Sequence, residues 1–145
     1  MQKKFLFIFG TRPEAIKMAP LIEECSQHTK HINFKVCTTG QHLEMLEQVI
    51  SFFEINVDYE LKLMKPNQTL FDITTIGINL LKPILEDYKP DLVIVQGDTT
   101  TAFIGTLSAF YLKIPVAHIE AGLRSFDNLS PFPEEVNRIM ISTMK

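Results

Sequence analysis

Short apolar segments alternate with helical segments along the whole chain, and this alternation most constrains the fold. Buried strands are predicted at residues 4–10, 33–39, 59–63, 91–96 and 114–119. Helices are predicted at residues 13–27, 43–53, 70–88, from about 97 to 112, and from 133 onward. Strands that alternate with helices over short links form a parallel sheet with helices on both faces. The sequence therefore predicts an α/β doubly wound parallel sheet with strand order 3-2-1-4-5.

Prolines set expectations for two of these helices. Pro13 is an allowed first-turn residue, and Thr11 with Glu14 has the pattern of a capping box that would start the helix slightly earlier. Pro20 inside the first helix predicts a kink, and Pro83 predicts an interruption of the long helix.

The length and the amino-acid composition fit one ordinary domain of a cytosolic protein. The chain has 145 residues, and its 46% apolar content is enough for one core. A net charge of −3 does not suggest a nucleic-acid surface. Cys25 and Cys37 lie too far apart for the spacing typical of paired metal ligands, and both are interpreted as free thiols in the core. The apolar run near the amino terminus is too short for a signal peptide, and no run is long enough for a membrane span.

The last predicted helix has no recognisable C-terminal cap in the sequence. Val136, Ile139 and Met140 begin an apolar stripe, and the sequence reaches Lys145 with no C-cap signal. This pattern favours a chain that continues in a longer protein. We therefore expect Ile139 and Met140 to be less well covered than such residues normally are.

Charged residues stand where the predicted strands end. Arg12 and Lys17 follow the first strand, Asp98 follows the fourth, and Glu120 ends the fifth. Open α/β sheets bind ligands at the carboxyl ends of their strands. Together with Glu134, these residues would place three carboxylates and two cations at one edge. Such an edge suits a phosphorylated sugar, and crowding is expected to raise the pKa of at least one carboxylate.

Each of these residues also has a purely structural interpretation. The two cations could be surface charges on a solvated helix, and the Gln41-His42 turn could be an ordinary polar turn. Asp98 or Thr99 could be an N-cap. Glu120 could simply pair with Arg124, and one of the acidic residues after Pro133 could complement the helix dipole.

Four segments together resemble the non-hydrolysing UDP-N-acetylglucosamine 2-epimerases: residues 10–20, 97–100, 118–124 and 133–138. The resemblance implies the Rossmann-like, N-terminal half of a two-domain fold of the glycosyltransferase-B type. It implies interconversion of UDP-N-acetylglucosamine and UDP-N-acetylmannosamine without a nicotinamide or a metal. The implied route is anti-elimination of UDP to a 2-acetamidoglucal, followed by reprotonation of C2 on the other face and re-addition of UDP.

The resemblance also assigns roles to residues. The acid/base candidates are Asp98, Glu120 and Glu134. The substrate-binding candidates are Arg12, Lys17 and Arg138. Some members of the family bind a second UDP-N-acetylglucosamine as an activator, near residues matching Gln41, His42, Gln68 and Glu134. A position in that region that is basic in some members is Asn67 in this chain.

The main departure from the family is length. Its members are more than twice as long, and their second domain supplies most of the uridine and diphosphate contacts, including a catalytic His. The chain is therefore expected to be one domain, residues 1–145, of a cytoplasmic homodimer in cell-envelope polysaccharide biosynthesis, and to be inactive alone. The alternatives are a sugar-nucleotide hydrolase or glycosyltransferase domain of the same fold, and a non-catalytic nucleotide-sugar-binding module.

Overall fold

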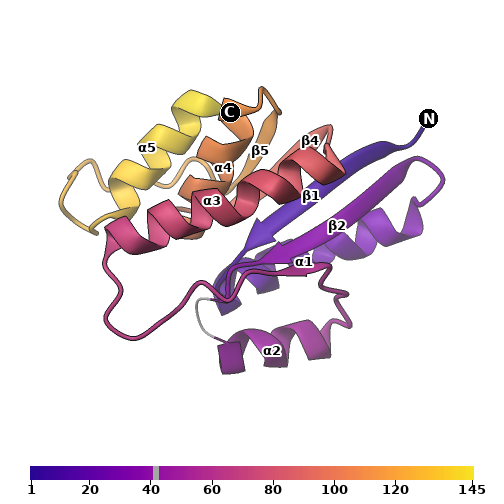
Figure 1. Ribbon diagram of the computed structural model, residues 1–145, viewed down its shortest axis with the longest axis horizontal. Helices are drawn as coiled ribbons and strands as arrows, with labels where there is room; N and C mark the ends of the chain where they lie inside the picture. The colour runs from indigo at the N-terminus through magenta and orange to yellow at the C-terminus, as the bar shows by residue number, and fades with distance from the viewer. Residues whose placement is uncertain (41–42) are drawn as a thin grey trace.

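A five-stranded parallel sheet forms the centre of the molecule in the computed structural model, which describes residues 1–40 and 43–145 (Figure 1). The strands are β1 (Lys3–Phe9), β2 (Ile32–Thr38), β3 (Tyr59–Glu60), β4 (Leu92–Gln96) and β5 (Val116–Ile119). They are arranged in the order β3-β2-β1-β4-β5, with every neighbouring pair parallel. The predicted fold class and strand order are confirmed.

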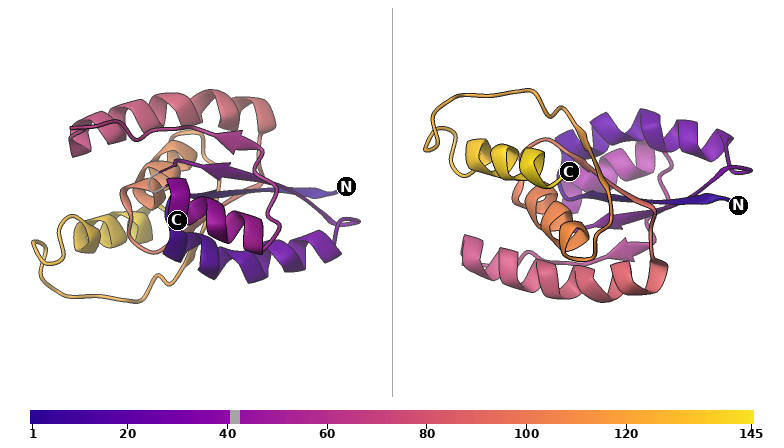
Figure 2. Two further views of the ribbon diagram at one scale, coloured as in Figure 1. Left: turned by 90° about the horizontal axis from the view of Figure 1, so that it is seen from below. Right: turned by 90° about the horizontal axis from the view of Figure 1, so that it is seen from above.

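Helices cover both faces of this sheet (Figure 2). On one face lie α1 (Arg12–Gln27) and α2 (Leu43–Phe52). On the other lie α3 (Leu70–Tyr88) and α4 (Thr100–Tyr111), and α5 (Glu134–Met144) packs against α4 and β5. None of the helices in the described part of the chain has the length and apolar character that a membrane span requires.

Two strands are shorter than predicted, for local reasons. The chain leaves β3 after Glu60 because Lys62 has a φ of 48°, which breaks the extended backbone. The strand β5 begins at Val116 because Pro115 has no N–H to donate to a neighbouring strand. Both strands lie at the edges of the sheet, where pairing on one side leaves their ends less constrained.

The helix starts follow the predicted chemistry, whereas the predicted break at Pro83 is wrong. The capping box of Thr11 and Glu14 is formed, and α1 begins at Arg12 and runs through Pro20 to Gln27. The helix α3 is continuous through Pro83. A proline removes only one helical hydrogen bond, and burial of Leu81 and Leu85 on either side of Pro83 holds the two halves in line.

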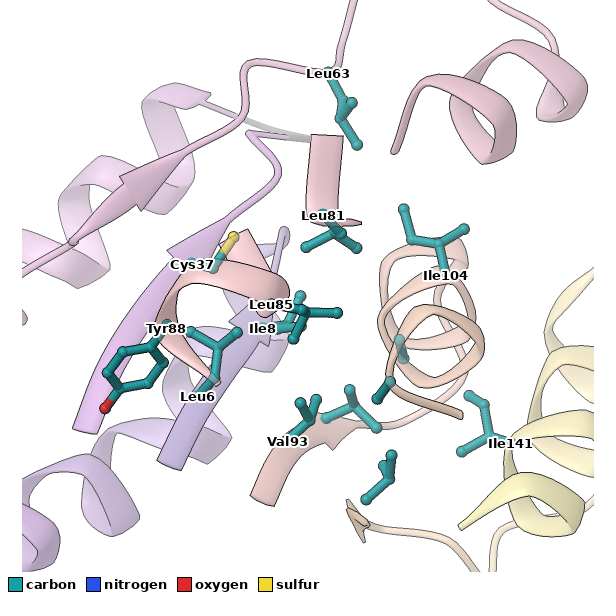
Figure 3. Packing of buried hydrophobic residues seen from close by; sticks show 14 residues of the cluster. Leu6, Ile8, Cys37, Leu63, Leu81, Leu85, Tyr88, Val93, Ile104 and Ile141 are labelled. Atoms are coloured by element: carbon teal, nitrogen blue, oxygen red, sulfur yellow. The ribbon is translucent and has the colours of Figure 1, made fainter. Parts of the chain in front are cut away.

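The central strand β1 carries the core on both of its faces. Leu6 and Ile8 point toward α3 and α4, where they pack with Leu81, Leu85 and Ile104 (Figure 3). On the opposite face, the alternate residues Phe7 and Phe9 pack against α1 and α2. These four side chains are fully buried.

The two cysteines are free and buried, as predicted. Cys37 belongs to the core beside α3, and burial raises the pKa of its thiol to about 12. Cys25 lies on the α1 side of the sheet, and burial also raises the pKa of its thiol. Both therefore act as small apolar core residues and not as reactive thiolates.

The helix α5 buries a different face from the predicted one. Its buried residues are Glu135, Asn137, Arg138 and Ile141. Val136, Ile139 and Met140 are only half-buried, so the expectation of poor cover for the last two holds. The polar face turns inward because its side chains bind the loops at the carboxyl edge of the sheet.

Packing of α3 predicts a contrast between two adjacent leucines. Leu81 is 0% exposed, whereas Leu80 is 39% exposed. Leu81→Ala leaves a cavity and should lower the free energy of unfolding by about 3 kcal/mol. Leu80→Ala, the matched control, should lower it by roughly 1 kcal/mol or less. Urea denaturation of both variants measures the difference, and equal losses would contradict this packing.

Candidate active site

A cavity of about 550 Å³ lies at the carboxyl edge of the sheet, where β1, β4 and β5 end. Its walls include Glu14, Lys17, Gln96, Asp98, Glu120 and Arg138. The predicted clustering is confirmed for Lys17, Asp98 and Glu120, which line the same space, but Arg12 and Glu134 do not line it. A volume of this size is typical of small-molecule sites.

A second hollow, of about 510 Å³, lies between α1 and α2 and does not fit an anionic ligand. Its walls are mainly apolar, with Phe34, Phe52 and Phe53 among them, and its charged groups are Glu23 and Glu54. No cation lines it among the described residues. The carboxyl-edge cavity is therefore the better candidate for a phosphorylated ligand.

Glu120 is held in an uncommon conformation at the end of β5. Its φ of 61° lies in the left-handed region, which non-glycine residues seldom occupy. Its carboxylate accepts hydrogen bonds from the side chains of Lys17 and Gln96, and its backbone carbonyl accepts one from Arg138. The structural alternative of a Glu120–Arg124 pair is wrong, because the residue that pairs with Glu120 lies on α1.

The Lys17 ammonium sets the charge of Glu120. Its hydrogen bond is the main cause that lowers the pKa of the Glu120 carboxyl below the ordinary 4.5, while partial burial opposes it. Crowding therefore does not raise the pKa of Glu120, although a raised pKa was expected for at least one carboxylate of the cluster. The carboxylate is ionised at neutral pH, so it can accept a proton but does not hold one in the resting site.

Asp98 faces the cavity from the loop between β4 and α4. Its Oδ2 accepts a hydrogen bond from Arg138 at 2.5 Å, and its backbone carbonyl accepts one from Asn137 at 2.9 Å. Of the two N-cap candidates, Thr99 is the N-cap of α4, since its hydroxyl accepts from the Ala102 N–H at 3.0 Å. The Asp98 carboxylate is therefore not used to cap the helix.

The buried guanidinium of Arg138 joins the two acids. Its side chain is 3% exposed, and it donates both to the Asp98 carboxylate and to the Glu120 carbonyl. Because an arginine side chain is always charged, its burial requires such partners. The site therefore contains two ion pairs, Lys17–Glu120 and Arg138–Asp98, against one cavity.

The two acidic residues that begin α5 have different environments. Glu135 has a 2% exposed side chain, accepts from Arg124 Nε at 2.7 Å, and also accepts backbone hydrogen bonds. These come from Ser125 at 2.9 Å and Phe126 at 3.2 Å, and the Ser125 bond is the main cause that lowers the pKa of Glu135. Glu135 thus anchors a loop, a role that the sequence did not predict.

Glu134 does not line the cavity. Its Oε2 is buried and has no hydrogen-bond partner among the described residues. It lies one helical turn before Arg138, on the same side of α5. The acid/base role of Glu134 therefore stays a prediction. Its Oε2 makes no hydrogen bond that would stabilise the fold among the described residues.

Other predicted residues lie apart from these pairs. Arg12 is exposed in the first turn of α1 and does not line the cavity. Gln68 accepts a hydrogen bond from the Lys65 N–H at 2.7 Å, and its Nε2 is buried without a partner among the described residues. Gln41 and His42, the other activator candidates, lie outside the described residues.

His118 supports the turn after β4 and does not contact Glu120. Its Nε2 donates to the Gly97 carbonyl at 2.6 Å, which fixes the tautomer. Burial is the main cause that lowers the pKa of His118. Within residues 1–40 and 43–145, no group of three or more His, Cys, Asp and Glu side chains could hold a metal ion.

Glu14 is the site residue whose importance the sequence understates. Its capping-box role was predicted, but its carboxylate also accepts a hydrogen bond from Thr99 Oγ1 at 2.7 Å, across the cavity edge. The capping-box pattern of Thr11 and Glu14 predicted the bonds within α1. The second partner was not visible, because Thr99 lies 85 residues away in the sequence.

Comparison with known proteins connects this chain to one family. The family model described as UDP-N-acetylglucosamine 2-epimerase matches residues 23–145. The UDP-N-acetylglucosamine 2-epimerase of Neisseria meningitidis is 60% identical over 141 residues, which cover 97% of this chain and 38% of the relative. This chain thus spans well under half the length of that relative.

Solved structures agree with the sequence comparison. The crystal structure of UDP-GlcNAc 2-epimerase from Neisseria meningitidis bound to UDP-GlcNAc matches with a TM-score of 0.93 and 59% identity, over 98% of this chain and 38% of that one. A Streptomyces glycosyltransferase matches with a TM-score of 0.57 and 14% identity, over 81% of this chain and 38% of that one, and so shares the fold alone.

The Lys17–Glu120 pair predicts a measurable titration. A lowered pKa means that ionised Glu120 stabilises the fold above its unfolded pKa, and that this contribution is lost as the pH falls through the lower, folded pKa. Lys17→Met should move the pKa of Glu120 upward, whereas Lys17→Arg should leave it low. Carbon-13 NMR titration of the Glu120 carboxyl measures both, and an unchanged pKa in Lys17→Met would refute the assignment.

Proposed function

The chain belongs to the UDP-N-acetylglucosamine 2-epimerase family, and we propose that it is the N-terminal domain of an enzyme that interconverts UDP-N-acetylglucosamine and UDP-N-acetylmannosamine. The observation that carries this proposal is the pair of carboxylate–cation contacts, Lys17–Glu120 and Arg138–Asp98, on one cavity. Proton transfer at a sugar carbon and binding of a diphosphate need these two kinds of group together.

The nucleotide-sugar substrate is supported by a relative and by charge. The Neisseria meningitidis epimerase was solved bound to UDP-GlcNAc. In this chain, Lys17 and Arg138 present cationic groups to the cavity, and Arg12 lies at the start of the same helix as Lys17. We assign these three residues to the diphosphate side of the substrate. In the full-length enzyme, a second nucleotide-binding domain would close the site around the uridine.

The proposed chemistry is an elimination followed by an addition. A carboxylate removes the proton from C2, the C2–H electron pair forms the C1–C2 double bond, and the C1–O bond breaks with its electron pair on UDP. A proton then returns to the opposite face of C2 while UDP adds back to C1. Because inversion needs a proton carrier on each face, one carboxylate is not enough.

Three carboxylates are assigned to this proton transfer: Asp98, Glu120 and Glu134. The lowered pKa of Glu120 supports a base in its resting form. Asp98 faces the same cavity, and the unpartnered Oε2 of Glu134 is free of a structural role among the described residues. Lys17 and Arg138 stabilise the negative charge that builds up on the departing UDP.

The wider setting is proposed from the same features. Free buried thiols at Cys25 and Cys37 suit a cytoplasmic enzyme that makes a precursor for cell-envelope polysaccharides. Exposed apolar side chains on α3 and α4, Leu80, Phe110 and Tyr111, support a homodimer. Activator binding near Gln41, His42, Gln68 and Glu134 stays part of the proposal.

Isosteric variants of the full-length enzyme test the chemistry. Asp98→Asn, Glu120→Gln and Glu134→Gln remove the ability to carry a proton and change shape very little. Each should lower turnover by roughly 10²–10⁴-fold in a folded protein. The measurement is epimerisation together with deuterium incorporation at C2 from solvent D₂O.

The matched control is Asp91→Asn, which removes a carboxylate at the opposite edge of the sheet, where it binds Lys3. It should turn over at the wild-type rate. Near-wild-type exchange and turnover in all three cavity variants would show that these carboxylates only support the fold. Release of free N-acetylmannosamine would indicate a hydrolysing enzyme instead.

A further inference from the structure

Glu14 connects two loops of the cavity through one buried carboxylate. Its side chain is 1% exposed, and both of its oxygens accept hydrogen bonds. We propose that Glu14 is a positioning residue that holds Asp98 in place for proton transfer, by tying the first turn of α4 to the first turn of α1. The test of this inference by kcat rests on the proposed function, because it measures epimerisation.

The contacts divide between the two oxygens. Oε2 accepts from the Gly10 N–H at 3.0 Å and from the Thr11 N–H and Oγ1, both at 2.8 Å. Oε1 accepts from Thr99 Oγ1 at 2.7 Å. Thr11 and Thr99 are the N-caps of α1 and α4. One carboxylate therefore binds the capping hydroxyls of both helices that begin at the cavity.

Asp98 is the residue immediately before this link. On one side, Glu14 binds the neighbouring Thr99. On the other side, α5 binds Asp98 itself, through Asn137 to its carbonyl and through Arg138 to its carboxylate. Loss of the Glu14 link would remove the tie to α1 and leave only the contacts with α5 and β5, so the Asp98 carboxylate could shift relative to Lys17 and Glu120.

A carboxylate makes this link stronger than an amide can. Burial raises the pKa of Glu14, and the four hydrogen bonds that it accepts oppose that rise. A glutamine has one acceptor oxygen, which can keep the capping box of α1, because Gln is accepted at that position. Its NH₂ group cannot accept from the Thr99 hydroxyl and can only donate to it, so a charge-assisted O–H···O⁻ bond is replaced by a weaker, neutral N–H···O bond. Glu14→Gln therefore weakens the connection to α4 while it keeps the capping of α1.

The chain contains a matched control for this device. At the start of α3, Asp72 Oδ2 accepts from the Thr69 N–H at 2.8 Å and from Thr69 Oγ1 at 2.7 Å, the same capping box as in α1. Its other oxygen makes no contact with another loop among the described residues, and the pair is exposed. Asp72→Asn thus changes a cap of the same type without changing a connection between loops.

The experiment measures kcat and KM for full-length enzyme carrying Glu14→Gln, Asp72→Asn, Asp98→Asn and the Glu14→Gln/Asp98→Asn double substitution. We expect Glu14→Gln to lower kcat by roughly 10–100-fold with a smaller change in KM, because misplacement of a proton carrier acts on the chemical step. Asp72→Asn should leave kcat unchanged. In the Asp98→Asn background, Glu14→Gln should cause less than about a twofold further loss.

A merely structural role for Glu14 predicts a different result. If Glu14→Gln only loosened the fold, its loss of kcat would multiply with the loss caused by Asp98→Asn. A double variant whose kcat is reduced by the product of the two single losses would therefore overturn the proposal. Wild-type kcat in both Glu14→Gln and Thr99→Val would also overturn it. Thr99→Val, which removes the same hydrogen bond together with the N-cap bond of α4, should lower kcat at least as much as Glu14→Gln does. Thr99→Ser, which keeps the hydroxyl and both bonds, should keep the wild-type kcat.

A second measurement keeps this inference separate from the proposed function. In the 145-residue chain, Glu14→Gln should shift the backbone amide NMR signals of Asp98 and Thr99, whereas Asp72→Asn should shift only signals near Thr69. If the full-length wild type does not epimerise, the proposed function fails, and this NMR comparison alone decides the link. Unshifted signals at Asp98 and Thr99 would overturn it.

Discussion

The burial of the Arg138 guanidinium is the interaction on which the arrangement of the site depends. A charged group that is 3% exposed is stable only when its donors are satisfied, and here they bind the Asp98 carboxylate and the Glu120 carbonyl. Through these contacts α5 joins the ends of β4 and β5. The polar face of α5 turns inward for this reason, although an ordinary amphipathic helix would bury its apolar stripe.

The architecture was predictable because it depends on patterns that are local in the sequence. The apolar run at residues 92–95 and the strict strand–helix alternation required a parallel sheet, and the order of strands followed. Even the gathering of Lys17, Asp98 and Glu120 at one edge was available, since the ends of parallel strands meet there. Helix starts were also local, as the capping box of α1 shows.

The partners of the charged residues were less predictable, because they are set by packing between distant segments. Arg124 was the nearest cation to Glu120 in the sequence, but it binds Glu135, while Glu120 binds Lys17, 103 residues away. The continuity of α3 at Pro83 has the same origin, since tertiary burial outweighs the local cost of proline. The bond of Glu14 to Thr99 and the bonds of Glu135 to the loop at Arg124 form only when the chain folds, and no sequence pattern predicted either of them.

The left-handed backbone at Glu120 has a consequence for how this site can evolve. A non-glycine residue there costs roughly 1–2 kcal/mol relative to a glycine, and Asn also tolerates this conformation well. Genetic drift toward Gly or Asn would therefore meet little resistance from the backbone, although each removes the carboxylate. Retention of a glutamate at this position therefore depends on what its carboxylate does and not on the backbone, so a relative that no longer needs the acid would be expected to lose Glu120 while keeping its fold.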